Sequence, residues 1–108
     1  MKKIEIKIKE DIYIVELALT EEEQYKGLSG RESLAEKEGM LFIFKEEKSP
    51  YFVMRNMDFP LDFLFIDKDN KIIDIQTGEV DSKDHYEVDE TIKAILELTP
   101  EESTAVGV

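Results

Sequence analysis

Residues 39–66 constrain the fold most strongly, because large apolar residues gather there in short runs that polar and turn-forming residues separate. Residues 40–44 and 61–66 are apolar on both faces of an extended chain, with Asp62 as the one charge in the second run. Short apolar runs bounded by turn signals are typical of buried strands. A chain of 108 residues also has the usual size of one domain. We therefore expect a single domain over residues 1–108, with its core built around residues 39–66.

Other strands are expected on both sides of this stretch. Ile4, Ile6 and Ile8 alternate with charged residues, which predicts a strand with one face in water. Residues 12–18 follow a turn at Glu10-Asp11 and are expected to be the hairpin partner of that strand. Further strands are expected at residues 51–55, 71–76 and 91–98, the last of which fits a strand better than a helix. Strands on short connections usually pair as antiparallel neighbours.

Two helices are indicated by their ends. Thr20 can cap a first helix, Glu23 completes a capping box three residues later, and Gly27 is placed to end it. Thr99-Pro100 begins a second helix, because proline is favoured at the first helical position. Residues 32–37 are expected to form another helical turn. The elements predict a mainly β (α+β) domain, a curled or barrel-like antiparallel sheet of about six to seven short strands with one or two short helices.

Composition excludes several classes of protein. The net charge is −12, and both nucleic acid and anionic membrane surfaces select basic patches, so we expect neither as a partner. The chain has no cysteine, which excludes disulfides, zinc-thiolate sites, iron–sulfur clusters and thiol catalysis. The N-terminus lacks a signal-peptide apolar region and no apolar run approaches about 18 residues, so a cytoplasmic location is expected. Abundant Lys and Glu, few amides and no Cys are typical of a thermophilic source.

The arginines and one aspartate are the most unusual polar residues. The chain has twelve lysines but only two arginines, Arg31 and Arg55, and both lie beside the apolar segment. Arginine offers a rigid bidentate fork that lysine lacks. Asp62 should be paired, because a lone buried charge costs several kcal/mol. We expect it to accept a hydrogen bond from Arg31, from Arg55 or from a backbone N–H of residues 56–59. Such a contact is either a tie that holds a loop to the sheet or the polar end wall of a ligand pocket.

Other polar clusters fit turns better than sites. Asn56 and Asp58 favour a turn closed by their own side chains, although contact with a ligand remains an alternative. Asp67-Lys68-Asp69-Asn70 is similar to the start of a calcium loop, but Ile72 stands where that loop requires glycine, so a hairpin turn is expected. A Ser-His-Asp triad would need His85, the only histidine, which fits a solvated loop residue better. We expect no metal site and no cofactor.

Three short motifs follow one another along the chain: Gly27-Leu28 with Arg31, Gly39-Met40-Leu41-Phe42, and Phe52-Val53-Met54-Arg55-Asn56 leading to Pro60-Leu61-Asp62. With these motifs the chain resembles the domain-of-unknown-function 192 family over most of its length, from about residue 18 to residue 98. The chain departs from the family pattern at Val53, where tryptophan is usual, and at Met57, where threonine is usual. The resemblance implies a small, mainly β domain with a barrel-like sheet, in a family without an assigned activity.

Three functions are left open by these observations. The first is a non-enzymatic binding or accessory module for a small polar or anionic ligand, because an arginine fork beside an amide suits such a ligand. Its candidate site consists of Arg31, Met54, Arg55, Asn56 and Asp62. The second is an enzyme that uses Asp62 as general acid or base, which needs a carboxyl pKa raised by burial. The third is a purely structural or interaction domain. A pocket that reaches Asp62 would favour either of the first two over the third.

Overall fold

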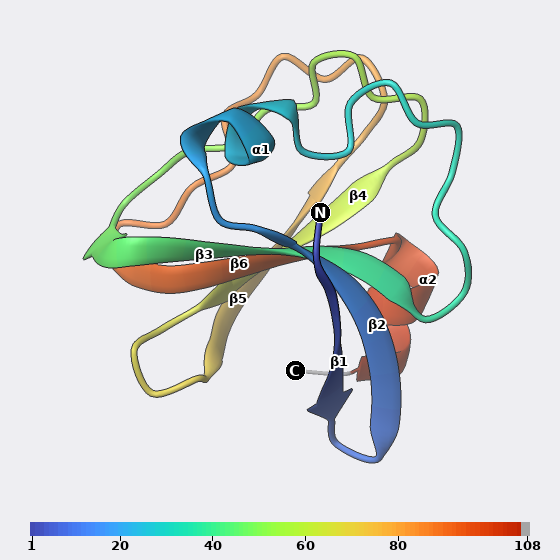
Figure 1. The fold of residues 1–108 in the computed structure, drawn as a ribbon. Coiled ribbons are helices and arrows are strands. Elements are labelled where there is room, and N and C mark those ends of the chain that lie inside the picture. Colours follow the sequence, from blue (N-terminus) through green and yellow to red (C-terminus); the bar gives the residue numbers. More distant parts are fainter. Residues whose placement is uncertain (107–108) are drawn as a thin grey trace.

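Within the described part of the chain, six strands form one sheet in the order β1-β2-β3-β6-β4-β5 (Figure 1). The structure is a computed structural model that describes residues 1–106, with side chains as far as Ser103. The strands are β1 (Lys3–Ile8), β2 (Asp11–Ala18), β3 (Glu38–Lys48), β4 (Leu61–Ile66), β5 (Ile72–Gly78) and β6 (Ile92–Leu98), and the helices are α1 (Glu21–Lys26) and α2 (Pro100–Val106). The two helices have six and seven residues, and neither is long enough to cross a membrane.

The predicted fold class is confirmed, with two refinements to the sheet. β2 and β3 pair in parallel, whereas the other neighbours are antiparallel. The reason is the long connection over residues 19–37, which includes α1 and returns the chain to run beside β2 in the same direction. The sheet is twisted but open, because β1 and β5 lie at its two edges and do not pair with each other. It is therefore a curled mixed sheet and not a closed barrel.

Local signals account for the ends of α1. The hydroxyl of Thr20 accepts from the backbone N–H of Glu23 at 3.0 Å, and the Glu23 carboxylate accepts from the backbone N–H of Thr20 at 3.1 Å. This is the predicted capping box. The backbone N–H of Gly27 donates to the carbonyl of Glu23, and its φ of 50° is in the left-handed region that favours glycine. The helix therefore begins and ends where the sequence predicts.

Two predicted elements are wrong. Residues 51–55 do not form a strand, since only Phe52 pairs, through an isolated bridge to Tyr86. The segment turns instead at residues 54–57, where the backbone N–H of Met57 donates to the carbonyl of Met54 and both methionines enter the core. Residues 32–37 do not form a helical turn either. Lys37 has a φ of 60° directly before β3, and a helical run cannot continue through that conformation.

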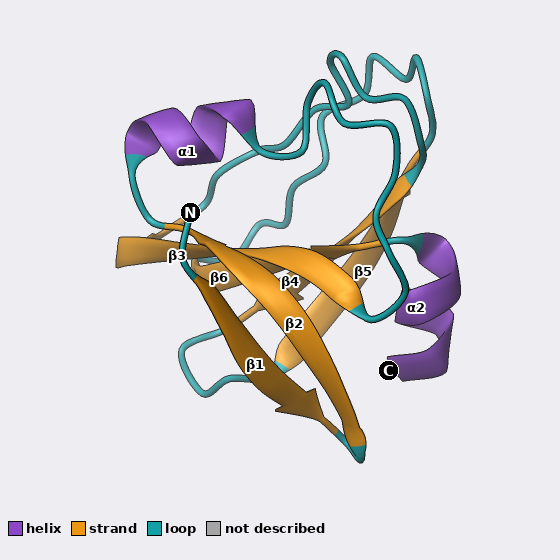
Figure 2. Ribbon diagram, turned by 45° about the vertical axis from the view of Figure 1, so that its right-hand side comes forward, coloured by secondary structure: helices purple, strands orange, loops and turns teal. Residues whose placement is uncertain are grey.

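The core lies on both faces of the sheet. The loop-covered face packs beneath α1 and the long connections, and its strand residues are Met40, Phe42, Phe63, Phe65 and Ile95. The opposite face is built by Tyr13, Val15, Leu64, Leu96 and Leu98. Figure 2 shows α1 and most of the loops on one side of the sheet and α2 toward the other. The long connections therefore cover only the first face, and any hollow that they enclose lies there.

Candidate functional site

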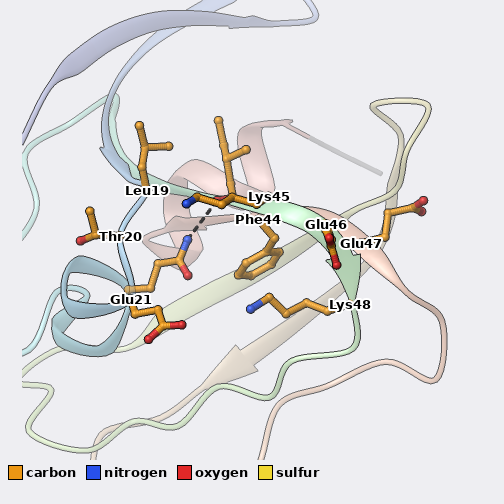
Figure 3. A pocket seen from close by; sticks show the side chains of 10 residues that line it. Leu19, Thr20, Glu21, Phe44, Lys45, Glu46, Glu47 and Lys48 are labelled. Carbon is orange, nitrogen blue, oxygen red and sulfur yellow. Dashed lines mark hydrogen bonds between the residues drawn. The ribbon is translucent and has the colours of Figure 1, made fainter.

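Two hollows flank α1 on the loop-covered face. The first, of about 680 Å³, lies between α1 and the end of β3, and Figure 3 shows Phe44 and Lys48 in this space. Its partly buried amide is already paired, because Gln24 Nε2 donates to the carbonyls of Ala18 at 2.9 Å and Ile43 at 3.0 Å. The remaining wall consists largely of the charged end of β3, Lys45 to Lys48. The Gln24 amide in this hollow already has its hydrogen-bond partners, so the hollow is the weaker candidate for a binding site.

The second hollow has a volume of about 560 Å³ and is called here the Glu97 cavity. Glu97 lies on β6 between Met40 of β3 and Phe63 of β4, which are its directly paired neighbours. The residue is only 4% exposed, and its Oε1 has no hydrogen-bond partner among the described residues. Buried polar atoms are nearly always hydrogen-bonded, so a cavity-lining residue with a buried, unpaired carboxyl oxygen makes this hollow the stronger candidate for a site.

Burial has a direct effect on the charge of this group. Removal from water raises the pKa of Glu97 from 4.5 to about 8, because the ionised form loses its hydration and gains no partner. At neutral pH the side chain is therefore mainly an uncharged acid. Such a group has one O–H donor and can also accept a hydrogen bond. The floor of the cavity is polar without being charged.

The mouth of the cavity carries cations and exposed aromatic rings. Arg55 lies over the ring of Tyr25, with 4.8 Å between its guanidinium carbon and the ring centroid. Tyr51 stacks on His85 at 4.3 Å between centroids. Tyr25 and Tyr51 are 75% and 59% exposed, unusually high for such large rings. Lys26 also lines the cavity. The entrance therefore combines flat apolar surfaces with positive charge.

Arg55 is the one residue of the predicted site that lines this cavity. Arg31 instead forms a bidentate pair with Glu16 of β2, in which Nη2 donates to Oε1 at 3.0 Å and Nη1 donates to Oε2. The hydrogen bonds from Arg31 lower the pKa of Glu16. Arg31 thus ties the turn after α1 to the sheet, and this contact favours a structural role for it.

The predicted pairing of Asp62 with an arginine or with residues 56–59 is wrong. Asp62 is 6% exposed, and its Oδ1 accepts a hydrogen bond of 2.6 Å from the hydroxyl of Thr77, its paired neighbour on β5. Side chains alternate along a strand, so Asp62 points to the opposite face while Phe63 points to the loop-covered face. The arginines and residues 56–59 are on the loop-covered side, out of its reach. Asp62 lines neither of the two hollows.

Met54 and Asn56 position the loop around the cavity. Met54 is 2% exposed and packs on Gly78, where an added Cβ would lie 2.6 Å from the methionine sulfur. Asn56 has a φ of 59°, which asparagine tolerates well in turns, and its carbonyl accepts from the backbone N–H of Gly30 at 3.1 Å. Met54 therefore holds the segment 51–60 against the end of β5, and Asn56 holds it against the turn after α1. Val53 and Met57, where the chain departs from the family pattern, both line the cavity.

Glu97 is not part of the site predicted from the sequence, because the hydrophobic pattern of residues 91–98 predicts a strand and no function. It interrupts the apolar run of residues 94–98 as Asp62 interrupts that of residues 61–66. Glu97 therefore carries the same sequence signal as Asp62, a single acidic residue within a buried strand.

Comparisons with known proteins agree with this architecture. The chain is similar to a protein from Sinorhizobium meliloti 1021 described as a candidate transcription regulator, with 32% identity, a TM-score of 0.85, and coverage of 91% of this chain and 77% of that one. It is also similar to a protein of unknown function from Novosphingobium aromaticivorans DSM 12444, with 27% identity, a TM-score of 0.85, and coverage of 98% and 78%. No curated protein matches the chain. The family model DUF192, described as uncharacterized ACR, matches residues 4–108, so the chain belongs to the DUF192 family.

Proposed function

We propose that this domain is a non-enzymatic binding module and that the Glu97 cavity holds one small organic molecule. The observation that supports this proposal best is that Glu97 is a buried residue of the cavity lining whose Oε1 has no hydrogen-bond partner among the described residues. Leaving a buried polar group unpaired costs about 1–3 kcal/mol, which a bound molecule could offset. The cavity volume of about 560 Å³ also falls within the usual range for small-molecule sites.

The lining supports this proposal over a purely structural role. Apolar side chains form most of the inner wall, with Leu28, Phe42 and Met57 among them. Small-molecule sites typically combine such a wall with a few polar groups that fix orientation. The net charge of −12 favours a ligand sensor or accessory module over a domain that contacts nucleic acid directly. The relative described as a candidate transcription regulator is compatible with a ligand sensor and also with a domain that contacts nucleic acid.

Thermal-shift screening against a panel of small metabolites tests the proposal. Compounds that occupy the cavity should raise the melting temperature of the wild-type protein and of Asp62→Asn, whose change lies on the opposite face. Val53→Trp should respond to none of them, because the larger ring fills space at the cavity wall. Val80→Trp is the matched control, since Val80 is exposed and lies outside the cavity lining. A panel without hits, or hits that Val53→Trp retains, would contradict the proposal.

An enzyme is the second candidate, and the raised pKa of Glu97 is the observation that favours it. A general acid works best when its pKa is near the operating pH, and Glu97 meets this condition better than a solvated carboxylate does. Asp62 gives less support, because it lies on the face away from the cavity. Recovery of the bound compound unchanged after prolonged incubation would favour the binding module. Turnover that Glu97→Gln abolishes would favour the enzyme.

A further inference from the structure

We propose that the ligand of the Glu97 cavity is a small organic carboxylate whose apolar body ends in a neutral hydrogen-bonding group such as a hydroxyl. This inference rests on the proposed function and names the class of molecule for that same site. In this arrangement the carboxylate lies at the mouth among Lys26, Lys48 and Arg55. The apolar body then passes along the aromatic and aliphatic wall. The hydroxyl meets Glu97 at the floor.

The positive charge at the mouth of the cavity is the reason to expect an anionic ligand. Acidic residues outnumber basic ones by 26 to 14 in the whole chain. The cavity lining reverses this balance, with Lys26, Lys48 and Arg55 against Glu21 and the neutral acid of Glu97. The three cations come from α1, the end of β3 and the segment 51–60, so the fold gathers them from separate parts of the chain. A local positive mouth on an acidic protein attracts a small anion while the rest of the surface repels it.

The cations are also free to bind an anion. Within the described residues, none of the three takes part in an ion pair. Arg55 lies over Tyr25, and Lys48 lies 4.9 Å from the centroid of the Phe44 ring. Stacking on a ring orients a cation and leaves its N–H donors available. An incoming carboxylate can therefore accept charge-assisted hydrogen bonds without breaking existing ion pairs.

Glu97 at the floor of the cavity determines which group the ligand carries at the end away from its carboxylate. Glu97 is held between Met40 and Phe63 on the loop-covered face, and its neighbours there offer it no polar partner. An ionised carboxylate at this position would repel a ligand anion, whereas the neutral acid does not. A hydroxyl can both donate to the acid and accept from it. A purely apolar end would leave the acid unpaired and would bind less tightly.

A matched set of three probes tests each part of the inference by titration calorimetry. The probes are para-hydroxyphenylacetate, phenylacetate, which lacks the hydroxyl, and para-hydroxyphenylacetamide, which lacks the charge. We expect the hydroxy acid to bind tightest and each of the other probes to bind about tenfold more weakly or worse. Arg55→Gln should weaken only the two acids, with Lys68→Gln on the β4–β5 turn as the control. Glu97→Leu should remove the advantage of the hydroxyl and leave the preference for the anion.

The outcomes separate this inference from the proposed function. Equal affinity for para-hydroxyphenylacetate and para-hydroxyphenylacetamide would show that the cavity does not prefer an anion, although the cavity would remain a binding site. Equal affinity for the two acids in the wild type would overturn the role of Glu97 at the far end. Binding of other panel compounds that Val53→Trp abolishes, together with no binding of any of the three probes, would show that the ligand class is wrong. Failure of every compound in the panel as well would overturn both proposals.

Discussion

Glu97 and Asp62 are buried acidic residues on adjacent strands, and their side chains point to opposite faces of the sheet. Glu97 of β6 pairs with Phe63 of β4, and Asp62 is the residue that directly precedes Phe63. Asp62 has a hydrogen-bond donor in Thr77, whereas Oε1 of Glu97 has none among the described residues. The two groups are close in the sheet but differ in role: the contacts of Asp62 join two strands, and Glu97 faces a cavity.

Replacing Glu97 with Gln is expected to stabilise the domain increasingly as the pH rises. Burial raises the pKa of Glu97 from 4.5 to about 8, so between these values the folded state holds a proton that the unfolded chain has released. Folding is therefore most favourable near the lower value and loses up to about 1.4 kcal/mol for each pH unit until about pH 8, where the loss levels off. Glutamine does not titrate, so Glu97→Gln lacks this contribution.

Urea unfolding at several pH values between about 5 and 9 measures the difference. The stability curves of wild type and Glu97→Gln should lie close together at the acidic end and separate toward the alkaline end. The change in net charge with pH affects both proteins and cancels in the comparison. Glu5→Gln, at an exposed carboxylate of β1, is the control and should run parallel to wild type. Parallel curves for Glu97→Gln as well would show that Glu97 ionises as it does in water.

Removing the hydroxyl of Thr77 should destabilise the domain by about 1 kcal/mol, because the buried Asp62 loses its donor. The effect lies at the lower end of the usual range because Thr77 is itself exposed and water can approach. Asp62→Asn should cost less than Thr77→Val, since an amide oxygen still accepts from the hydroxyl. Chemical unfolding of the single variants and of the double variant gives the coupling energy. Additive effects would mean that the hydrogen bond does not contribute to stability.

The sequence predicts those parts of this fold that depend on neighbouring residues. The capping box of Thr20 and Glu23 follows from local chemistry, and so does the turn at Asp67, whose carboxylate accepts from the backbone N–H groups of Asp69 and Lys71. The alternation of Ile4, Ile6 and Ile8 predicts β1 because a half-buried strand repeats every two residues. These signals need no knowledge of what lies across the sheet.

Contacts between segments that are distant in the sequence cannot be predicted from local patterns. The parallel pairing of β2 and β3 depends on the path of residues 19–37. The partner of Arg31 is Glu16, one of 26 acidic residues, and nothing in its local pattern marks it. The cavity arises where α1, the end of β3, β6 and the segment 51–60 meet, so only the assembled fold brings Arg55 and Glu97 together. The cytoplasmic location and the thermophilic source stay predictions.

Gly39→Ala should destabilise the domain by about 1–3 kcal/mol, the usual cost of forcing extra atoms into a packed core. A Cβ at this position would lie 2.5 Å from the carbonyl oxygen of Glu97 and 2.7 Å from Cδ2 of Leu98. The backbone of β6 would have to move away from β3 next to the cavity floor. Met40→Leu is the control, because it nearly conserves volume at the adjacent position. Thermal unfolding compares the two, and an alanine variant as stable as wild type would contradict this close approach.

Breaking the pair of Arg31 and Glu16 should have a small effect that disappears in acid. The hydrogen bonds from Arg31 lower the pKa of Glu16 below 4.5. The pair therefore stabilises the fold above the unfolded pKa, and its contribution is lost as the pH falls through the lowered pKa of the folded state. Because both side chains are partly exposed, Arg31→Gln should cost less than about 1 kcal/mol at neutral pH. Unfolding near neutral pH and in acid checks this, and a loss that persists in acid would contradict it.

Val53→Trp should weaken ligand binding strongly while the domain stays folded. Val53 is only partly buried and lines the Glu97 cavity, so a larger ring at this position can extend into the hollow without displacing the core. We expect the affinity for para-hydroxyphenylacetate to fall about tenfold or more, since the ring removes space that the probe needs. Val80→Trp adds the same bulk in the exposed part of the loop after β5 and should bind as wild type does. Calorimetric titration with circular dichroism separates lost binding from lost folding, and a folded Val53→Trp of wild-type affinity would place the ligand elsewhere.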